Sequence, residues 1–129
     1  MSAALREVHR VLHSGGVFVV IVAPEAALYD TTLQAVELLR DASHVRDYRV
    51  TEWSVMLSAA TFTHACKSEW KLDMQFNPWI ARMRTPPKRM QATRSLFDSA
   101  PEEVAAYFMV QDDCSFSMYA ALLEAKREN

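Results

Sequence analysis

An uninterrupted apolar segment near the start of the chain constrains the fold more than any other feature of the sequence. Residues 17–23 read VFVVIVA, without alternation of polar and apolar side chains. Neither face of a strand with this composition suits water, and such strands usually lie in parallel sheets that helices cover on both faces. Residues 5–12 have the spacing of an amphipathic helix, and Gly15-Gly16 supply a turn between the two. The sequence therefore predicts an α/β fold.

The clearest alternating pattern lies at residues 62–76. Alternation over this length predicts a long strand with one buried and one solvated face. Charged residues occupy the face predicted to be solvated. The face predicted to be buried carries Phe62, His64, Cys66, Trp70, Leu72, Met74 and Phe76.

Helices are predicted in the remaining apolar segments. One covers residues 25–40, another begins behind Thr51 as its N-cap, and a helical cap covers about 77–108. The segment 115–126 has helical propensity, and periodicity alone does not decide between a helix and a strand there. No repeat or flexible linker interrupts the sequence, so we predict a single domain over residues 1–129.

The glycine count excludes a large class of sites. The chain has 2 glycines, which are adjacent and are both used in the turn at residues 15–16. Loops that cradle phosphate or adenosyl groups need several glycines, because backbone N–H groups must approach the ligand closely. We therefore expect no self-contained nucleotide or adenosyl site in this chain.

Charge and cysteine content indicate the expected environment. A net charge of -2 and a pI of about 6.1 give no attraction to nucleic acid or to an anionic membrane. The longest apolar run, residues 17–23, is too short to span a bilayer. Cys66 and Cys114 are too far apart in sequence to suggest a metal site. These features predict a cytoplasmic protein that binds neither nucleic acid nor membranes.

Polar residues that could reach a ligand are concentrated in the segment after the second predicted helix. Asp41, His44 and Asp47 lie there within seven residues of each other. A histidine with neighbouring carboxylates can act as a general base. The same residue types also serve as turn and cap residues, and the sequence leaves the two interpretations equally open.

Other polar groups in the sequence favour structural roles. His9 and His13 have the spacing of a metal-binding pair, but no third ligand is evident. His64 and Cys66 share an apolar row, which favours packing over nucleophilic catalysis. A basic stretch next to Trp79 could form an anion-binding or nucleic-acid surface, although a solvated helix face is favoured. That stretch contains Arg82, Arg84, Lys88, Arg89 and Arg94.

The sequence contains several segments that together suggest a family: LREVHRVLHSGGVFVV (5–20), RDASHVR (40–46), TEW (51–53), AATF (59–62), WIARMRTPP (79–87) and SFS (115–117). These segments resemble class I S-adenosylmethionine-dependent methyltransferases. The family form close to L-R-E-x-x-R-V-L-K-P-G-G leads into the fifth strand, and the present sequence has His13-Ser14 in place of Lys-Pro. Other segments resemble the motifs R-D-P-S-H-V, E-W and A-A-G-F of the ubiquinone-type, small-molecule subgroup. Thr61 stands where that subgroup has glycine, and Ala42 where it has proline.

The resemblance implies a particular part of the methyltransferase fold. The family binds its cofactor with a Gly-rich loop and an acidic residue that follow the first two strands, and this sequence resembles the part that begins just before the fifth strand. It therefore implies a partial Rossmann-like fold, a mixed three-stranded sheet in the order 5-7-6 with flanking helices. Residues 115–126 would form the seventh strand. S-adenosylmethionine is the cofactor of the parent family, and we expect none to bind this chain alone.

The resemblance also implies a role on the acceptor side of methyl transfer. We expect a truncated S-adenosylmethionine-dependent methyltransferase, inactive alone, that retains the acceptor-side pocket. No catalytic, cofactor-binding or metal-binding residue is assigned. The alternative is a non-catalytic small-molecule-binding or dimerisation module derived from that fold. The expected substrate-binding residues are Asp41, His44, Trp79, Arg82 and Arg84.

An unpaired edge of the first strand predicts a partner. The fourth strand of the family would cover one edge of residues 17–23, and bare apolar edges invite pairing with another chain. We therefore expect a homodimer, or a complex with a separate chain, formed through the edge of Val17–Ala23.

Overall fold

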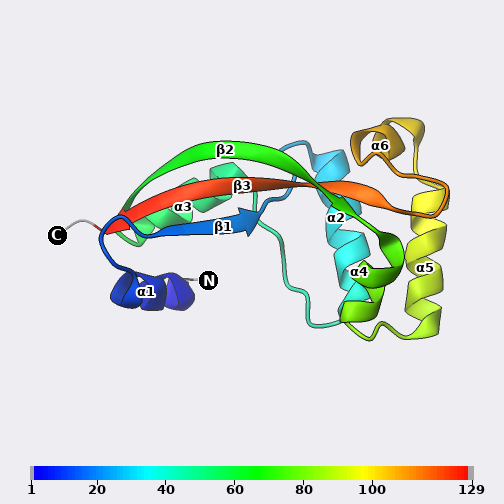
Figure 1. Ribbon diagram of the computed structural model, residues 1–129, viewed down its shortest axis with the longest axis horizontal. Coiled ribbons are helices and arrows are strands. Elements are labelled where there is room, and N and C mark those ends of the chain that lie inside the picture. The colour runs from blue at the N-terminus through cyan, green and yellow to red at the C-terminus, as the bar shows by residue number, and fades with distance from the viewer. Residues whose placement is uncertain (1, 128–129) are drawn as a thin grey trace. The chain divides into compact units, whose positions relative to one another are not determined.

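The structure is a computed structural model that describes residues 2–127. These residues form two compact units (Figure 1). Unit 1 contains residues 2–23, 48–70 and 119–127, and unit 2 contains residues 24–47 and 71–118. Two long strands, β2 (Phe62–Met74) and β3 (Phe116–Arg127), run through both units.

Unit 1 contains helices α1 (Ser2–Val11) and α3 (Val50–Ala59), strand β1 (Val17–Ile21) and part of each long strand. The strand order of the sheet is β1-β3-β2. The α/β class predicted from the sequence is therefore confirmed. The last element is a strand in spite of its helical propensity, because pairing with neighbouring strands outweighs a preference of a few tenths of a kcal/mol per residue.

The sequence led us to expect a mixed three-stranded sheet. The described residues show no parallel pairing between strands. The pairing with a defined register is two-stranded and antiparallel, between β1 and β3, from Val17 opposite Glu124 to Ile21 opposite Ala120. Contacts between β2 and β3 have the same sense: Thr63 Oγ1 donates to Lys126 O at 3.3 Å, and Lys67 pairs with Glu124 at 3.6 Å. Because β3 runs against both of its neighbours, no two adjacent strands are parallel.

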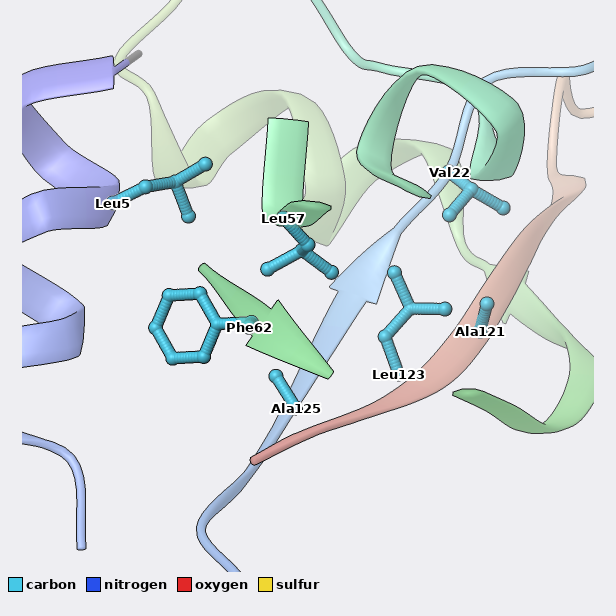
Figure 2. Close-up of a cluster of buried hydrophobic side chains, with 7 residues drawn as sticks. All are labelled: Leu5, Val22, Leu57, Phe62, Ala121, Leu123 and Ala125. Atoms are coloured by element: carbon cyan, nitrogen blue, oxygen red, sulfur yellow. The ribbon is translucent and has the colours of Figure 1, made fainter. Parts of the chain in front are cut away.

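The core of unit 1 lies between the sheet and the two helices (Figure 2). Leu5 of α1 and Leu57 of α3 point toward Phe62 at the start of β2. Leu57 is fully buried, and burying one leucine side chain is worth about 2 kcal/mol. The predicted amphipathic helix before β1 is thus confirmed. The buried cluster contains Leu5, Val22, Leu57, Phe62, Ala121, Leu123 and Ala125.

The predicted buried face of β2 is wrong over the middle of the strand. Phe62 is buried and His64 half-buried, but Cys66 and Trp70 are exposed. The helices of unit 1 pack on the cluster around Phe62, so the alternating pattern identified the strand but not how much of it is covered.

The edge of β1 is shorter than we predicted. The strand ends at Ile21, and the backbone N–H of Ala23 donates to Tyr48 O at 3.0 Å. Ala23 also forms an isolated parallel bridge with Arg49. The chain itself therefore covers the end of the segment Val17–Ala23.

Unit 2 contains helices α2 (Ala27–Arg40), α4 (Phe76–Arg82), α5 (Pro87–Asp98) and α6 (Glu102–Tyr107). Helix α2 packs against α5 and α6. The helices expected in the cap are present, and α5 begins at a proline, as the first helical position favours. The N-cap expected at Thr51 is wrong, because the N-cap of α3 is Arg49.

Aromatic side chains fill the interior of unit 2. The ring centroids of Trp79 and Phe116 lie 4.9 Å apart in an edge-to-face arrangement, and those of Phe97 and Phe116 lie 4.8 Å apart. Tyr29 of α2 stacks on Tyr107 of α6 at 3.9 Å.

Within residues 2–127, no helix has the length and apolar character required to cross a membrane.

Candidate functional site

The segment after α2 folds into a turn that uses the side chain of Asp41. Its Oδ1 accepts hydrogen bonds from Ser43 N at 2.9 Å and Ser43 Oγ at 2.7 Å. These bonds hold the pKa of the Asp41 carboxyl below its usual range. The backbone N–H of His44 donates to Asp41 O at 3.0 Å. Asp41 is therefore a turn residue that positions His44.

The side-chain amide of Gln34, on α2, connects this loop to the helix. Its Nε2 donates to Asp30 Oδ1 and to Asp47 O, each at 2.9 Å. Its Oε1 accepts from Asp47 N at 3.1 Å and lies 3.0 Å from His44 Nε2. One neutral side chain thus contacts both ends of the segment between His44 and Asp47, together with a buried carboxylate.

Asp47 carries the most strongly perturbed carboxyl group of this loop. Its pKa is raised to about 6, mainly by burial and in smaller part by the charges of Glu37 and Asp30, while His44 and Arg40 oppose the rise. Its Oδ2 is buried and has no hydrogen-bond partner among the described residues. A carboxyl group with a pKa near neutrality exchanges its proton readily at physiological pH, which suits acid–base chemistry or ligand binding.

Two arginines balance the buried carboxylates of α2. Asp30 and Glu37 are 5% and 8% exposed. Arg46 Nη2 lies 3.2 Å from Asp30 Oδ2, and Arg40 Nη1 lies 3.0 Å from Glu37 Oε2. Buried carboxylates require partners of opposite charge, and these two arginines compensate the charges of Asp30 and Glu37.

The structure separates the five predicted substrate-binding residues. Asp41 and His44 lie together in the loop. Trp79 is fully buried, with Arg40 over its ring at 4.7 Å and Arg40 Nε bonded to its carbonyl at 3.0 Å. Arg82 and Arg84 are exposed at the end of α4, and their side chains form no hydrogen bond within the described residues. Trp79 therefore contacts Arg40 in the interior and is not accessible to solvent.

Two residues of the basic stretch have structural roles. Arg89 Nε donates to Leu39 O at 2.8 Å, and its Nη2 donates to Leu38 O, which satisfies carbonyls at the end of α2. Arg94 lies over the ring of Phe76 at 4.2 Å and donates to Asn77 Oδ1 at 2.8 Å. The interpretation favoured from the sequence, a solvated helix face, is therefore wrong for these two residues, which are half-buried and contact neighbouring elements.

His9, His64 and Cys66 belong to unit 1. His9 packs edge-to-face against Phe62 at 4.9 Å, which is a core contact. His64 is half-buried, whereas Cys66 is exposed and lies 3.8 Å from Ser68 O. Cysteine, histidine and carboxylate residues in the described range gather at no point as the three ligands that a metal ion requires.

A cavity of about 560 Å³ lies elsewhere in unit 2, where β2 meets α4 and β3 begins. Inside it, Ser117 Oγ donates to Asp73 Oδ1 at 2.8 Å. Asp73 and Asp113 are its charged lining residues, and none of the five predicted residues lines it. The residues of the loop at 41–47 are not among those that line this cavity.

Gln34 and Asp30 were missed in the sequence. Both lie on α2, where a polar residue ordinarily indicates the solvent face of an amphipathic helix. The contacts that make them important join α2 to residues at least ten positions away. The one available signal was their helical spacing of four residues, which places their side chains on the same face.

The chain is similar to bacterial proteins over almost its whole length. It is 39% identical to YafE of Escherichia coli strain K12, an uncharacterized protein, over 98% of this chain and 62% of YafE. It is 32% identical to the uncharacterized methyltransferase YcgJ of Bacillus subtilis strain 168, over 94% of this chain and 51% of YcgJ. The chain thus spans about half to three-fifths of these relatives. No family model matches it.

Solved structures show the same relation. The crystal structure of YcgJ from Bacillus subtilis superimposes with a TM-score of 0.85 at 33% identity, over 99% of this chain and 58% of that one. A putative methyltransferase, BH2331 from Bacillus halodurans, gives a TM-score of 0.87 at 28% identity, over 99% and 63%. The chain therefore has the α/β fold of part of a methyltransferase, and its relatives include methyltransferase-like proteins.

Proposed function

We propose that these 129 residues are the acceptor side of an S-adenosylmethionine-dependent methyltransferase of the small-molecule, ubiquinone-type subgroup. The observation that carries the proposal is the match of 99% of the chain to two methyltransferase structures, of which it covers 58% and 63%. In this account β1, β3 and β2 correspond to the fifth, seventh and sixth strands of the fold. The sequence segments that resemble the family support this correspondence.

Unit 2 is the part that would hold the methyl acceptor. Methyl transfer from a sulfonium depends mainly on positioning the nucleophile and excluding water. Asp47 and His44 supply groups that accept protons in a loop tied to α2. Arg82 and Arg84 add exposed positive charge at the end of α4. These groups suit an acceptor with a hydroxyl or amine nucleophile and an anionic substituent.

The donor side is what the 129 residues do not supply. They contain 2 glycines, and Gly15 serves the turn before β1 with a φ of +79°. A glycine-rich adenosyl-binding loop cannot be built from them. We therefore propose that the chain alone does not bind S-adenosylmethionine and has no methyltransferase activity.

Fragment binding tests the acceptor role. A ¹⁵N-labelled chain is titrated with small phenols, amines and aromatic carboxylates while its amide spectrum is recorded. We expect saturable shifts at residues 41–47 for at least one hydroxyl or amine class, and Asp47→Asn should weaken them. Shifts confined to the cavity at Asp73 and Ser117 would contradict our choice of site.

The second candidate function is a non-catalytic binding or dimerisation module. The cavity of about 560 Å³, which lies apart from the loop, favours small-molecule binding without methyl transfer. We also propose that another chain, a second copy or a separate protein, pairs with the edge of β1, here reduced to Val17–Ile21. Sedimentation tests this pairing: dimers are expected, and a monomer with rapidly exchanging β1 amides would refute it.

We also propose that the protein is cytoplasmic. Cys66 and Cys114 are both free, which agrees with a reducing, cytoplasmic setting.

A further inference from the structure

We infer that Gln34 is a positioning residue: it fixes His44 in the form that carries hydrogen on Nε2, so that Nδ1 is the proton acceptor of unit 2. Both residues belong to unit 2, where Gln34 lies on α2 and His44 in the following loop. The link to methyl transfer rests on the proposed function. The hydrogen-bond geometry does not depend on it.

The backbone of Asp47 determines how the Gln34 amide is oriented. A backbone N–H can only donate, and a backbone carbonyl can only accept. Asp47 N lies 3.1 Å from Oε1 of Gln34, and Asp47 O lies 2.9 Å from Nε2. Exchanging the amide oxygen and nitrogen would set donor against donor and acceptor against acceptor. The orientation therefore follows from the chain itself.

This orientation leaves one role for His44 Nε2. The two hydrogens of Gln34 Nε2 are directed to Asp30 Oδ1 and Asp47 O. Oε1 of Gln34 has no hydrogen to give, and it lies 3.0 Å from His44 Nε2. A hydrogen bond between these two atoms requires the hydrogen to be on Nε2. In the neutral ring, Nδ1 is then the nitrogen with a lone pair.

Nδ1 is placed to accept a proton. It forms no hydrogen bond with any other residue in the part of the chain that the structure describes. Asp41 and Asp47 both interact electrostatically with His44, so the positive charge of an imidazolium would face two carboxylates. Arg40 also acts on both of these carboxylates, and Glu37 and Asp30 act on Asp47.

The step that this arrangement serves is deprotonation of the acceptor. The C–S bond of a sulfonium methyl donor breaks while the methyl carbon forms a bond with a hydroxyl oxygen or an amine nitrogen. The proton on that atom passes to Nδ1 of His44, and the donor leaves as a neutral thioether. The imidazolium then holds hydrogens on both nitrogens, and its Nε2–H bond to Gln34 is unchanged.

Imidazole ¹⁵N spectra of the chain test the assignment without donor or acceptor. Nitrogen shifts give the position of the hydrogen on each neutral ring, and His44→Gln identifies the His44 signals. Exposed His13 is the internal reference. We expect the Nε2–H form at His44, with water exchange of that hydrogen slowed about tenfold or more relative to His13, the factor for one typical hydrogen bond.

Two variants separate positioning from stability. Gln34→Leu removes the acceptor, and the exchange protection at His44 should disappear. Gln34→Glu retains an acceptor oxygen for His44 but loses both donors, so protection should persist although folding is weakened. A hydrogen on Nδ1, or no protection in the wild type, would overturn the inference even if the leucine variant fails to fold. Loss of protection in folded Gln34→Glu would overturn it as well.

Discussion

Thr61 adopts a backbone conformation that a β-branched residue rarely adopts. Its φ is +62°, directly after the end of α3, where the family it resembles has glycine. Its hydroxyl donates to Ala60 O at 2.7 Å, which compensates part of the cost. The chain keeps the left-handed turn in spite of the substitution and retains the strain.

Replacing Thr61 with glycine should therefore stabilise the protein. The left-handed conformation costs an L-residue about 1 kcal/mol or more, and glycine does not pay this cost. We expect Thr61→Gly to raise the free energy of unfolding by about 1 kcal/mol in urea denaturation. Thr61→Ala is the matched control, since it keeps the strain and loses the hydroxyl bond. Equal stability of the two variants would contradict the assignment of strain.

Asp47 makes stability depend on pH near neutrality. Its folded pKa of about 6 lies above the usual 3.8, so the folded state binds the proton more tightly. Stability from this group is therefore complete below pH 4 and is lost as the pH rises through 6. Asp47→Asn should remove this loss and stabilise the chain at pH 7 by about 2 kcal/mol, a value discounted for partial exposure.

A matched control for Asp47 lies in the same loop. The pKa of Asp41 is lowered by its bonds to Ser43, so its contribution has the opposite sign. That contribution is present above the usual pKa and is lost as the pH falls. Melting temperatures from pH 4 to 8 should move in opposite directions for Asp41→Asn and Asp47→Asn relative to the wild type. Parallel curves would show that Asp47 is not the group responsible.

The end of α2 depends on a residue from another helix. Arg89 of α5 donates to the carbonyls of Leu38 and Leu39, while Thr85 Oγ1 donates to Arg40 O at 2.7 Å. Hydrogen bonds from a charged group are worth about 1.5–3 kcal/mol. Arg89→Ala should therefore lower the unfolding free energy by about 2 kcal/mol. The exposed neighbour Lys88 is the control, and Lys88→Ala should change it by less than about 0.5 kcal/mol.

Elements could be predicted where periodicity was strong, and boundaries and burial could not. The helix before β1 and the alternating strand at Phe62 were correct because their patterns are local. Burial of Cys66 was wrong, because alternation cannot show how far a strand extends beyond its helices. The role of Gln34 could not be predicted for a related reason. Its partners Asp47 and His44 become its neighbours only when the loop folds back on α2.

At the scale of the whole molecule, the chain has the fold of part of a methyltransferase. Unit 1 contains β1 and part of β2 and β3, and unit 2 carries the loop with His44 and Asp47. We propose that this part holds the methyl acceptor and that residues outside these 129 bind the donor. The resemblance, rather than composition or periodicity, supplied the strand order.

Calorimetric titration with S-adenosylmethionine tests this division most directly. Two proteins are compared: the 129-residue chain, and a fusion in which it replaces the matched part of Bacillus subtilis YcgJ. We predict no saturable heat for the chain alone and micromolar binding by the folded fusion. Micromolar binding by the chain alone, or none by a fusion whose amide spectrum shows a folded protein, would contradict the account.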